Sequence, residues 1–219
     1  MSSIAVIDYG MGNLRSVAKA LEHVDDRARV HITHEPEQVR RADRVVFPGQ
    51  GAIRDCMAEL QRLELDAVVL EAARNKPFLG ICMGMQALLE HSEENGGVDA
   101  LGLFSGRVRH FRDGFAAAGI APPGKVPHMG WNAVYQDVPH PIWNGIADAS
   151  HFYFVHSYFV ELLPDQLTIG RCDYGVPFTA AIARDNIVAT QFHPEKSQRV
   201  GLELLANFTR WDGEPGGHV

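Results

Sequence analysis

The chain has 219 residues, of which 46% are hydrophobic, and its 20 basic and 27 acidic side chains give a net charge of -7. A chain of this length without a linker-like stretch predicts one domain, which we place at residues 1–210, followed by a flexible tail at 211–219. The acidic balance opposes binding to nucleic acid or to an anionic membrane, so we expect a small-molecule substrate.

The cysteines and the amino terminus indicate the compartment. Cys56, Cys82 and Cys172 show neither the spacing of a disulfide framework nor that of a zinc site, and the histidines lack zinc-binding spacing as well. The first residues lead directly into an apolar strand without the pattern of a signal peptide, and no apolar run approaches the roughly 20 residues that cross a membrane. We therefore expect a cytoplasmic protein that needs no metal and no cofactor.

The first half of the chain alternates between predicted strands and helices. The apolar run Ile4–Ile7 predicts a buried strand, and apolar residues at helical spacing from Leu14 to Leu21 predict a helix with Asn13 at its N-cap. Further strands are expected at 30–32, 45–47 and 78–81, with a helical stretch that ends near Asn75 and a helix after Cys82. Such alternation predicts an α/β fold with a doubly wound, mostly parallel sheet and helices on both faces.

From Leu103 onward the pattern changes to strand-like segments joined by turns. These segments lie at 107–111, 151–160, 168–171 and 179–183. They predict an antiparallel section at one edge of the sheet. The Gly-, Ala- and Pro-rich segment 113–125 predicts a surface loop.

The segment Gly80-Ile81-Cys82-Met83-Gly84 lies between a predicted strand and a helical pattern that includes Met85, Leu88 and Leu89. Glycines two residues either side of a nucleophile allow a strained turn that exposes its side chain at the carboxyl end of the strand. A helix N-terminus at that point favours the thiolate form of a cysteine. In isolation, a small core cysteine beside two turn glycines would produce the same pattern.

A cysteine nucleophile needs a base, and the base needs a group that fixes its tautomer. His193 follows the predicted strand 187–190, and Glu195 stands two residues further on, with Pro194 stiffening the loop between them. In an open α/β sheet, ligands bind outside the carboxyl ends of the strands. The strand therefore delivers a base and an orienting carboxylate to the edge where Cys82 is expected.

Attack on an amide also requires donors for the developing oxyanion. The N–H of Met83 is the natural first donor, and the loop that contains Gly49 and Gly51 leaves a neighbouring strand and offers a second. A plain strand-to-helix turn is the alternative reading of that loop. Gln86 lies one helical turn after Cys82, and Glu94, expected to follow the same helix, is placed to receive an α-ammonium group unless it is a solvated helix-end charge.

Taken together, these residues resemble the class I (triad) glutamine amidotransferases, which have a flavodoxin-like fold. The resemblance rests on Gly-Ile-Cys-Met-Gly-Met-Gln at 80–86 and on His-Pro-Glu-Lys-Ser at 193–197. The segments 7–14, 125–132 and 154–158 narrow it to the members that supply ammonia for histidine biosynthesis. The resemblance extends from about Ile4 to Phe208, nearly the whole chain.

The resemblance implies a glutaminase that forms a glutamyl thioester on Cys82 and releases ammonia. His193 would act as base and acid, and Glu195 would orient it. The ammonia would pass to a (β/α)8-barrel cyclase subunit, the expected partner in a heterodimer, and the nucleotide that accepts it would bind that partner.

The remaining roles also follow from the resemblance, position by position. Residues of the glutamine pocket would be Gly49, Gly51, Met83, Gln86, Glu94, His156, Ser157 and Tyr158. Residues that face the cyclase would be Asn13, Trp131 and Lys196. Gln50 departs from the small apolar residue found there in many relatives, and the loop 113–125 is longer than the family minimum.

One further motif and two rival functions offer other readings, of which the two functions remain open. Gly10-Met11-Gly12 after the first strand suggests dinucleotide binding, but Arg15 stands where the third glycine is required. A glutaminase serving another synthase, for instance in pyridoxal phosphate synthesis, is a second reading, which the segment 125–132 opposes. A non-catalytic binding module of the same fold is the third, and the presence of Cys82, His193 and Glu195 opposes it.

Overall fold

The computed structural model describes residues 2–163 and 165–214. Five parallel strands form one side of the sheet, in the order β2-β1-β3-β4-β13. Their bounds are Ser3–Ile7 for β1, Arg29–Thr33 for β2, Arg44–Gly49 for β3, Phe78–Cys82 for β4 and Ile187–Thr190 for β13. Strands β4 and β13 are buried along their whole length, because helices cover both faces of the sheet.

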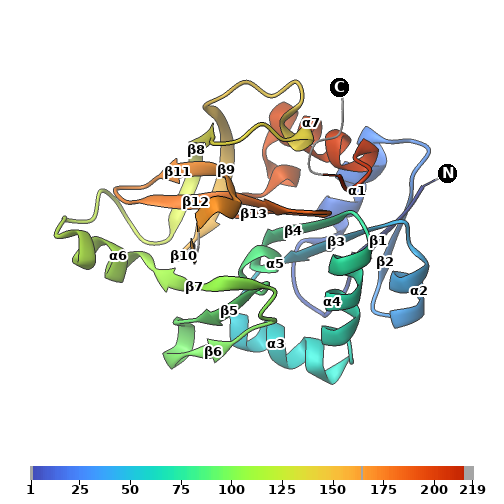
Figure 1. Cartoon of the computed structure of the whole chain (residues 1–219), viewed down its shortest axis with the longest axis horizontal. Coiled ribbons are helices and arrows are strands. Elements are labelled where there is room, and N and C mark those ends of the chain that lie inside the picture. The colour runs from blue at the N-terminus through green and yellow to red at the C-terminus, as the bar shows by residue number, and fades with distance from the viewer. Residues whose placement is uncertain (1, 164, 215–219) are drawn as a thin grey trace.

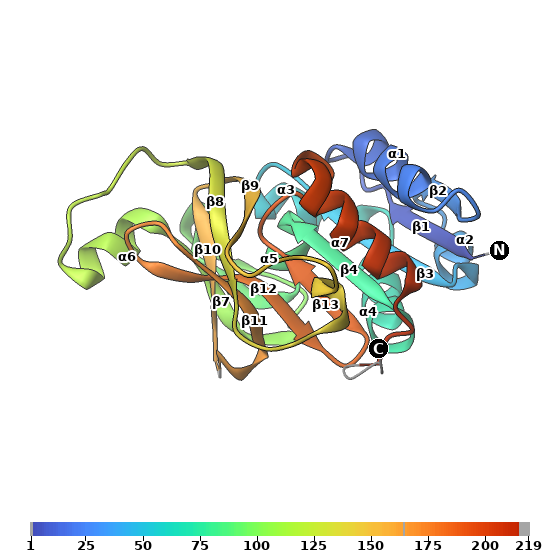
Figure 2. The same ribbon diagram turned by 90° about the horizontal axis from the view of Figure 1, so that it is seen from above.

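Helices lie on both sides of this sheet, as the sequence predicts. The α-helices are α1 (Leu14–Val24), α2 (Pro36–Arg41), α3 (Ile53–Arg62), α4 (Asp66–Asn75), α5 (Met83–Gln86), α6 (Phe111–Ala118) and α7 (Gln198–Arg210). Figures 1 and 2 show α1 and α7 side by side over one face, and α3 and α4 lie on the other. Apolar residues of α1 and α7 enter one hydrophobic core, and those of α2, α3 and α4 enter a second.

The second half of the chain extends the sheet with mainly antiparallel strands. These strands are β5 (Leu89–Ser92), β6 (Val98–Asp99), β7 (Phe104–His110), β8 (His128–Gln136), β9 (Ser150–His156), β10 (Tyr158–Leu162), β11 (Thr168–Asp173) and β12 (Pro177–Arg184). The main path continues from β13 through β12, β10, β7 and β5 to β6, whereas β11, β8 and β9 form a side branch. Four short 3-10 helices are η1 (Glu94–Gly96), η2 (Pro141–Trp143), η3 (Asp165–Leu167) and η4 (Pro194–Lys196). The α/β fold class and the antiparallel section are therefore confirmed.

Two local predictions are wrong, and the predicted N-cap is confirmed in its position. The segment expected as a loop at 113–125 begins inside α6, whose Phe111 and Phe115 rings stack 5.8 Å apart and anchor it in the core. The helix after Cys82 ends at Gln86, and Leu89 starts strand β5 instead. Asn13 precedes α1 as expected, but its side chain makes no capping hydrogen bond.

The predicted flexible tail does not begin at residue 211. The Trp211 side chain is only 4% exposed and packs 5.2 Å from the His140 ring. Arg44 donates hydrogen bonds to the carbonyl oxygens of Thr209 (2.9 Å) and Trp211 (2.7 Å), which attach this end of the chain to β3. The last part of the predicted tail, 215–219, lies outside the described residues.

Trp211→Ala tests this attachment. Removing a buried indole leaves a cavity, so we expect the free energy of unfolding to fall by about 3–5 kcal/mol. Urea denaturation followed by circular dichroism measures the change. Leu163→Ala, at a side chain that is 60% exposed, is the matched control and should change stability by less than about 0.5 kcal/mol. Equal, small effects of the two substitutions would show that residue 211 belongs to a tail.

Candidate active site

Cys82 occupies a strained turn between β4 and α5. Its φ is +55° and its ψ is -104°, a backbone conformation that L-residues rarely adopt. The glycines either side are required by close packing. A Cβ on Gly84 would lie 1.8 Å from the carbonyl oxygen of Phe47 in β3, and one on Gly80 would lie 2.9 Å from the Ala189 side chain in β13. The turn is therefore pressed between the two strands that neighbour β4.

His193 and Glu195 form a buried pair beside this turn. Nδ1 of His193 lies 2.9 Å from Oε1 of Glu195, and the two side chains are 2% and 1% exposed. The backbone of the loop is attached to β9, because the His193 N–H donates to the Tyr153 carbonyl (2.9 Å). Ser197 adds a second link, since its hydroxyl donates to the His193 carbonyl (2.7 Å) and accepts from the Tyr153 N–H (2.9 Å).

The charge state of His193 depends on its neighbours. Burial by itself lowers the pKa of this imidazole, but the Cys82 thiolate and Glu195 outweigh burial and raise the pKa to about 10. Among the described residues, Nε2 of His193 has no hydrogen-bond partner, and both His193 and Cys82 line the same pocket. The arrangement can therefore hold an imidazolium beside the Cys82 sulfur, with Nε2 directed into the site for proton transfer.

This pocket has a volume of about 310 Å³ and contains nearly all the predicted substrate residues. Its lining includes Cys82, Met83, Gln86, Glu94, His156, Ser157, Tyr158, His193, Gln50 and Gly51, together with Pro127 and Val155, which the sequence analysis missed. Gly49 does not line it. The tripeptide at 156–158 is close because the chain passes from β9 to β10 there, beside the end of β4.

Gly49 instead lies beside the nucleophile within the sheet. In the parallel pairing of β3 with β4, Gly49 is the register partner of Cys82. A Cβ there would lie 1.9 Å from the Tyr9 hydroxyl and 2.8 Å from the Met83 Cβ, so only glycine fits. Gly51 has a φ of +98° and completes the turn that leads to α3.

Glu94 reaches the pocket from η1 and not from the helix that carries Gln86, which corrects the sequence prediction. Its Oε2 accepts a hydrogen bond of 2.9 Å from the N–H of Ile53, the first residue of α3. The carboxylate therefore contacts the chain directly after the 49–52 loop. It also contributes a negative charge to a helix N-terminus.

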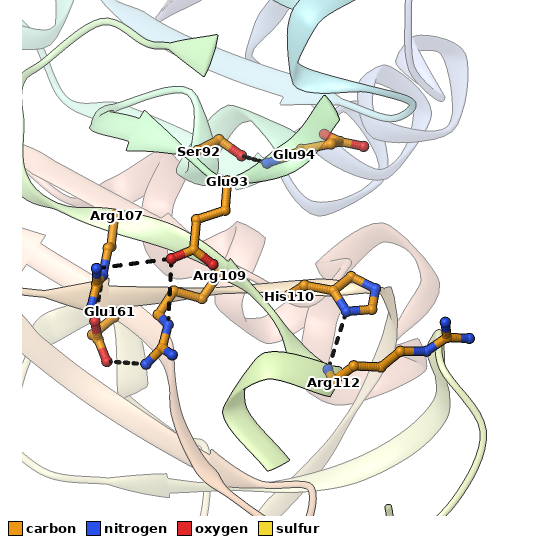
Figure 3. A network of polar contacts seen from close by, with 8 residues as sticks. All are labelled: Ser92, Glu93, Glu94, Arg107, Arg109, His110, Arg112 and Glu161. Atoms are coloured by element: carbon orange, nitrogen blue, oxygen red, sulfur yellow. Dashed lines mark hydrogen bonds and ion pairs between the residues drawn. The ribbon is translucent and has the colours of Figure 1, made fainter. Parts of the chain in front are cut away.

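A network of ion pairs holds the turn that carries Glu94 (Figure 3). Glu161 on β10 lies 2.8 Å from Arg107 and 3.0 Å from Arg109, both on β7. Glu93 lies 3.7 Å from Nε of Arg109 and 3.9 Å from Nη1 of Arg107. Because these side chains are partly exposed, the ion pairs add little to the stability of the fold. Their main effect is to position the turn that carries Glu94.

Gln191 is a buried residue of the site that the sequence analysis missed. Its amide lies 3.0 Å from Nε2 of Gln86 and its Nε2 lies 3.6 Å from the Cys82 sulfur. No local pattern marks it, because β13 ends at Thr190 and the contacts of Gln191 join segments that are far apart in the chain.

The residues predicted to face a partner do not enter the pocket. Trp131 on β8 is 45% exposed and packs edge-on against Tyr153 at 6.2 Å, and Lys196 lies 6.0 Å from the same ring. Asn13 precedes α1, which contacts η4, the short helix that ends with Lys196. Among the helices that the structure describes, none has the length and apolar character needed to cross a membrane.

The chain is similar to known proteins along nearly its whole length. The family model described as glutamine amidotransferase class-I matches residues 5–211. The imidazole glycerol phosphate synthase subunit HisH of Nitrosococcus oceani is 58% identical over 97% of this chain and 99% of its own length. The protein of the same name from Dechloromonas aromatica is 60% identical over 95% of this chain and 96% of its own length.

Solved structures with much lower identity share the fold. A crystal structure of a glutamine amidotransferase has a TM-score of 0.68 at 14% identity and covers 94% of this chain and 98% of its own. The Trypanosoma brucei CTPS glutaminase domain with bound acivicin has a TM-score of 0.62 at 17% identity and covers 97% of this chain and 95% of its own. At these identities the likeness extends to the fold alone.

Gly84→Ala tests the packing of the Cys82 turn. Because the added methyl overlaps the Phe47 carbonyl, we expect a loss of about 1–3 kcal/mol in stability and a slower reaction of Cys82 with iodoacetamide. Mass spectrometry of the Cys82 peptide measures that rate. In the control Gly119→Ala, the new methyl has nothing within 4 Å but the φ is +67°, so only stability should fall. An unchanged Cys82 rate in Gly84→Ala would contradict the prediction.

The raised pKa of His193 predicts a titration that depends on Cys82. Because the pKa is raised to about 10, the imidazolium should persist well above pH 6.5, where an ordinary histidine loses its proton. In Cys82→Ala the thiolate is absent, so the ring should lose its proton at lower pH. NMR of ¹⁵N-labelled histidine measures both titrations. His128, whose pKa burial lowers to about 4, is the internal control and should titrate alike in both proteins. Identical His193 curves would refute the pairing.

Proposed function

The chain belongs to the class-I glutamine amidotransferase family, and from this premise we propose that it is the glutaminase subunit of an imidazole glycerol phosphate synthase. The observation that carries the proposal is the buried His193–Glu195 pair beside the Cys82 turn, with His193 and Cys82 both lining a pocket of about 310 Å³. Full-length relatives that carry the synthase-subunit name support the choice within the family. Residues 1–210 would make up the glutaminase domain.

The reaction would begin with attack of the Cys82 thiolate on the side-chain amide carbon of glutamine. The C–S bond forms, and the carbonyl oxygen takes the negative charge in a tetrahedral intermediate. His193 gives its proton to the departing nitrogen, so ammonia leaves and a thioester remains. Water then attacks the thioester while His193 accepts its proton. The C–S bond breaks, which restores the thiolate and releases the carboxylic acid, whose remaining proton passes to solvent to leave glutamate. Glu195 keeps the imidazole in the required tautomer throughout.

Other residues would bind and polarise the substrate. The Glu94 carboxylate would receive the α-ammonium group, and the side-chain carbonyl of Gln86 offers an acceptor, because both hydrogens of its amide are directed to protein atoms. The backbone N–H of Met83 would bind the oxyanion together with a peptide of the 49–51 loop. The backbone at 156–158 would form the opposite wall.

The ammonia would serve a second subunit. We expect this partner to be a (β/α)8-barrel cyclase, which would use the ammonia to form imidazole glycerol phosphate and an aminoimidazole-carboxamide ribotide in histidine biosynthesis. The exposed indole of Trp131 beside Tyr153 and Lys196 would form part of the contact surface, with Asn13. Such a reaction belongs to the cytoplasm.

Glutamate release from glutamine tests the proposal. We expect a low rate from the chain alone and strong stimulation by the cyclase subunit with its nucleotide ligand, because an ordered 49–51 loop completes the oxyanion site. An enzymatic glutamate assay measures both rates. Full activity of the isolated chain would contradict the expected dependence on the partner. No stimulation by the cyclase would point to another synthase or to a non-catalytic module.

Cys82→Ala is the blank for this assay. It should abolish glutamine-dependent cyclisation but preserve cyclisation with added ammonium salt, since the acceptor nucleotide binds the partner. Loss of both activities would mean that Cys82 supports the interface instead of the chemistry.

A further inference from the structure

Gln191 connects the pocket wall to the nucleophile. Its side chain is 0% exposed and lies between the end of β13 and the His193 loop. Two polar contacts account for its position. One joins its Oε1 to Nε2 of Gln86 at 3.0 Å, and the other joins its Nε2 to the Cys82 sulfur at 3.6 Å. A glutamine buried this completely is placed by these contacts, because an unpaired buried amide is costly.

The direction of both contacts follows from one backbone carbonyl. The Tyr158 carbonyl can only accept, so the Gln86 atom 3.1 Å from it is the amino nitrogen Nε2. The same nitrogen donates its second hydrogen to Gln191, so the Gln191 atom that faces it is the oxygen. The remaining end of the Gln191 amide, its N–H donor, must then point at the Cys82 sulfur. The chain of bonds thus removes the usual ambiguity of amide orientation.

A donor at this position acts on the charge of the sulfur. An N–H group stabilises a thiolate more than it stabilises a thiol, and hydrogen bonds to charged groups are the stronger ones. The same N–H stabilises the thiolate as it leaves when water breaks the thioester. It also limits rotation of the Cys82 side chain, which keeps the sulfur directed at the pocket.

We propose that Gln191 is a further catalytic residue, which donates a hydrogen bond to the Cys82 thiolate, and that Gln86 is the positioning residue that orients its amide. The catalytic part rests on the proposed glutaminase function. The thiolate contact itself does not, so it can be measured without glutamine or partner.

The test must account for the other ionisable groups near the sulfur. His193 with Glu195 lies on the loop after β13, Tyr9 lies at the end of β1, and His156 and Glu94 line the pocket. The variants below leave all of these side chains in place. Because Gln191→Met also adds no charge, a change in the pH profile of Cys82 in that variant can be assigned to the amide contact.

The experiment is the pH dependence of Cys82 alkylation by iodoacetamide in the full chain, followed on the Cys82 peptide by mass spectrometry. Gln191→Met keeps the length of the side chain but has no donor. We expect the pH midpoint of alkylation to rise by about one unit, as expected for the loss of one hydrogen bond to a charged group. Gln61→Met, on the exposed face of α3, is the matched control and should leave the midpoint unchanged.

A second variant separates the contact from a merely structural role. In Gln86→Leu the residue at 191 is unchanged and no charge is added, but the donor that holds its oxygen is lost. The Gln191 amide is then free to turn over, so the alkylation midpoint should again rise, by less than in Gln191→Met. If Gln191→Met proves unstable by circular dichroism, Gln191→Leu, which also removes the donor without adding a charge, decides the question with the same expected rise.

A midpoint that stays within error of the wild-type value in a folded Gln191 variant would overturn the proposal. With glutamine and the cyclase present, Gln191→Met should lower kcat about tenfold with little change in KM, because the contact is made to the nucleophile and not to the substrate. If Gln191→Met shows the expected rise of the alkylation midpoint but the wild-type chain releases no glutamate with the cyclase present, the proposed function is refuted. The thiolate contact would still stand.

Discussion

The close approach of α5 to β3 is the constraint on which the site depends. Gly84 lies against the Phe47 carbonyl with no room for a side chain, and this contact fixes where α5 begins. Cys82 must then turn sharply at a positive φ, and its side chain lines the pocket, with the sulfur 3.6 Å from Nε2 of Gln191. The helix that follows has only four residues, so the thiolate depends on side-chain partners more than on a helix dipole.

The histidines around the pocket differ in charge, because burial keeps two of them neutral while charged neighbours favour a proton on the third. His156 and His128 are hydrogen-bonded to each other at 2.9 Å, and burial lowers the pKa of His156 to about 3 and that of His128 to about 4. Both rings are therefore neutral near pH 7 and serve as shape and hydrogen-bonding groups. His193 alone of these three has a carboxylate and a thiolate beside it, and it is the ring that can carry charge.

The sequence predicts those parts of the molecule that depend on short-range pattern. The strand, turn and helix around Cys82 and the alternation before residue 86 are correct, because buried parallel strands are continuous apolar runs bounded by turns. The short length of α5 was not predictable, since Leu88 and Leu89 fit a helix and a strand equally well. Gln191 and the ion pairs of Glu93 join segments far apart in the chain, and spacing along a sequence does not reveal such contacts.

The attachment of the His193 loop to β9 has a consequence for solubility. Among the described strands β9 pairs only with β8, so its other edge would expose unpaired N–H and carbonyl groups. At Tyr153, His193 and Ser197 occupy both of these groups. The loop that supports proton transfer therefore also shields a strand edge, and a displacement of this loop would create a template for intermolecular β-pairing and aggregation.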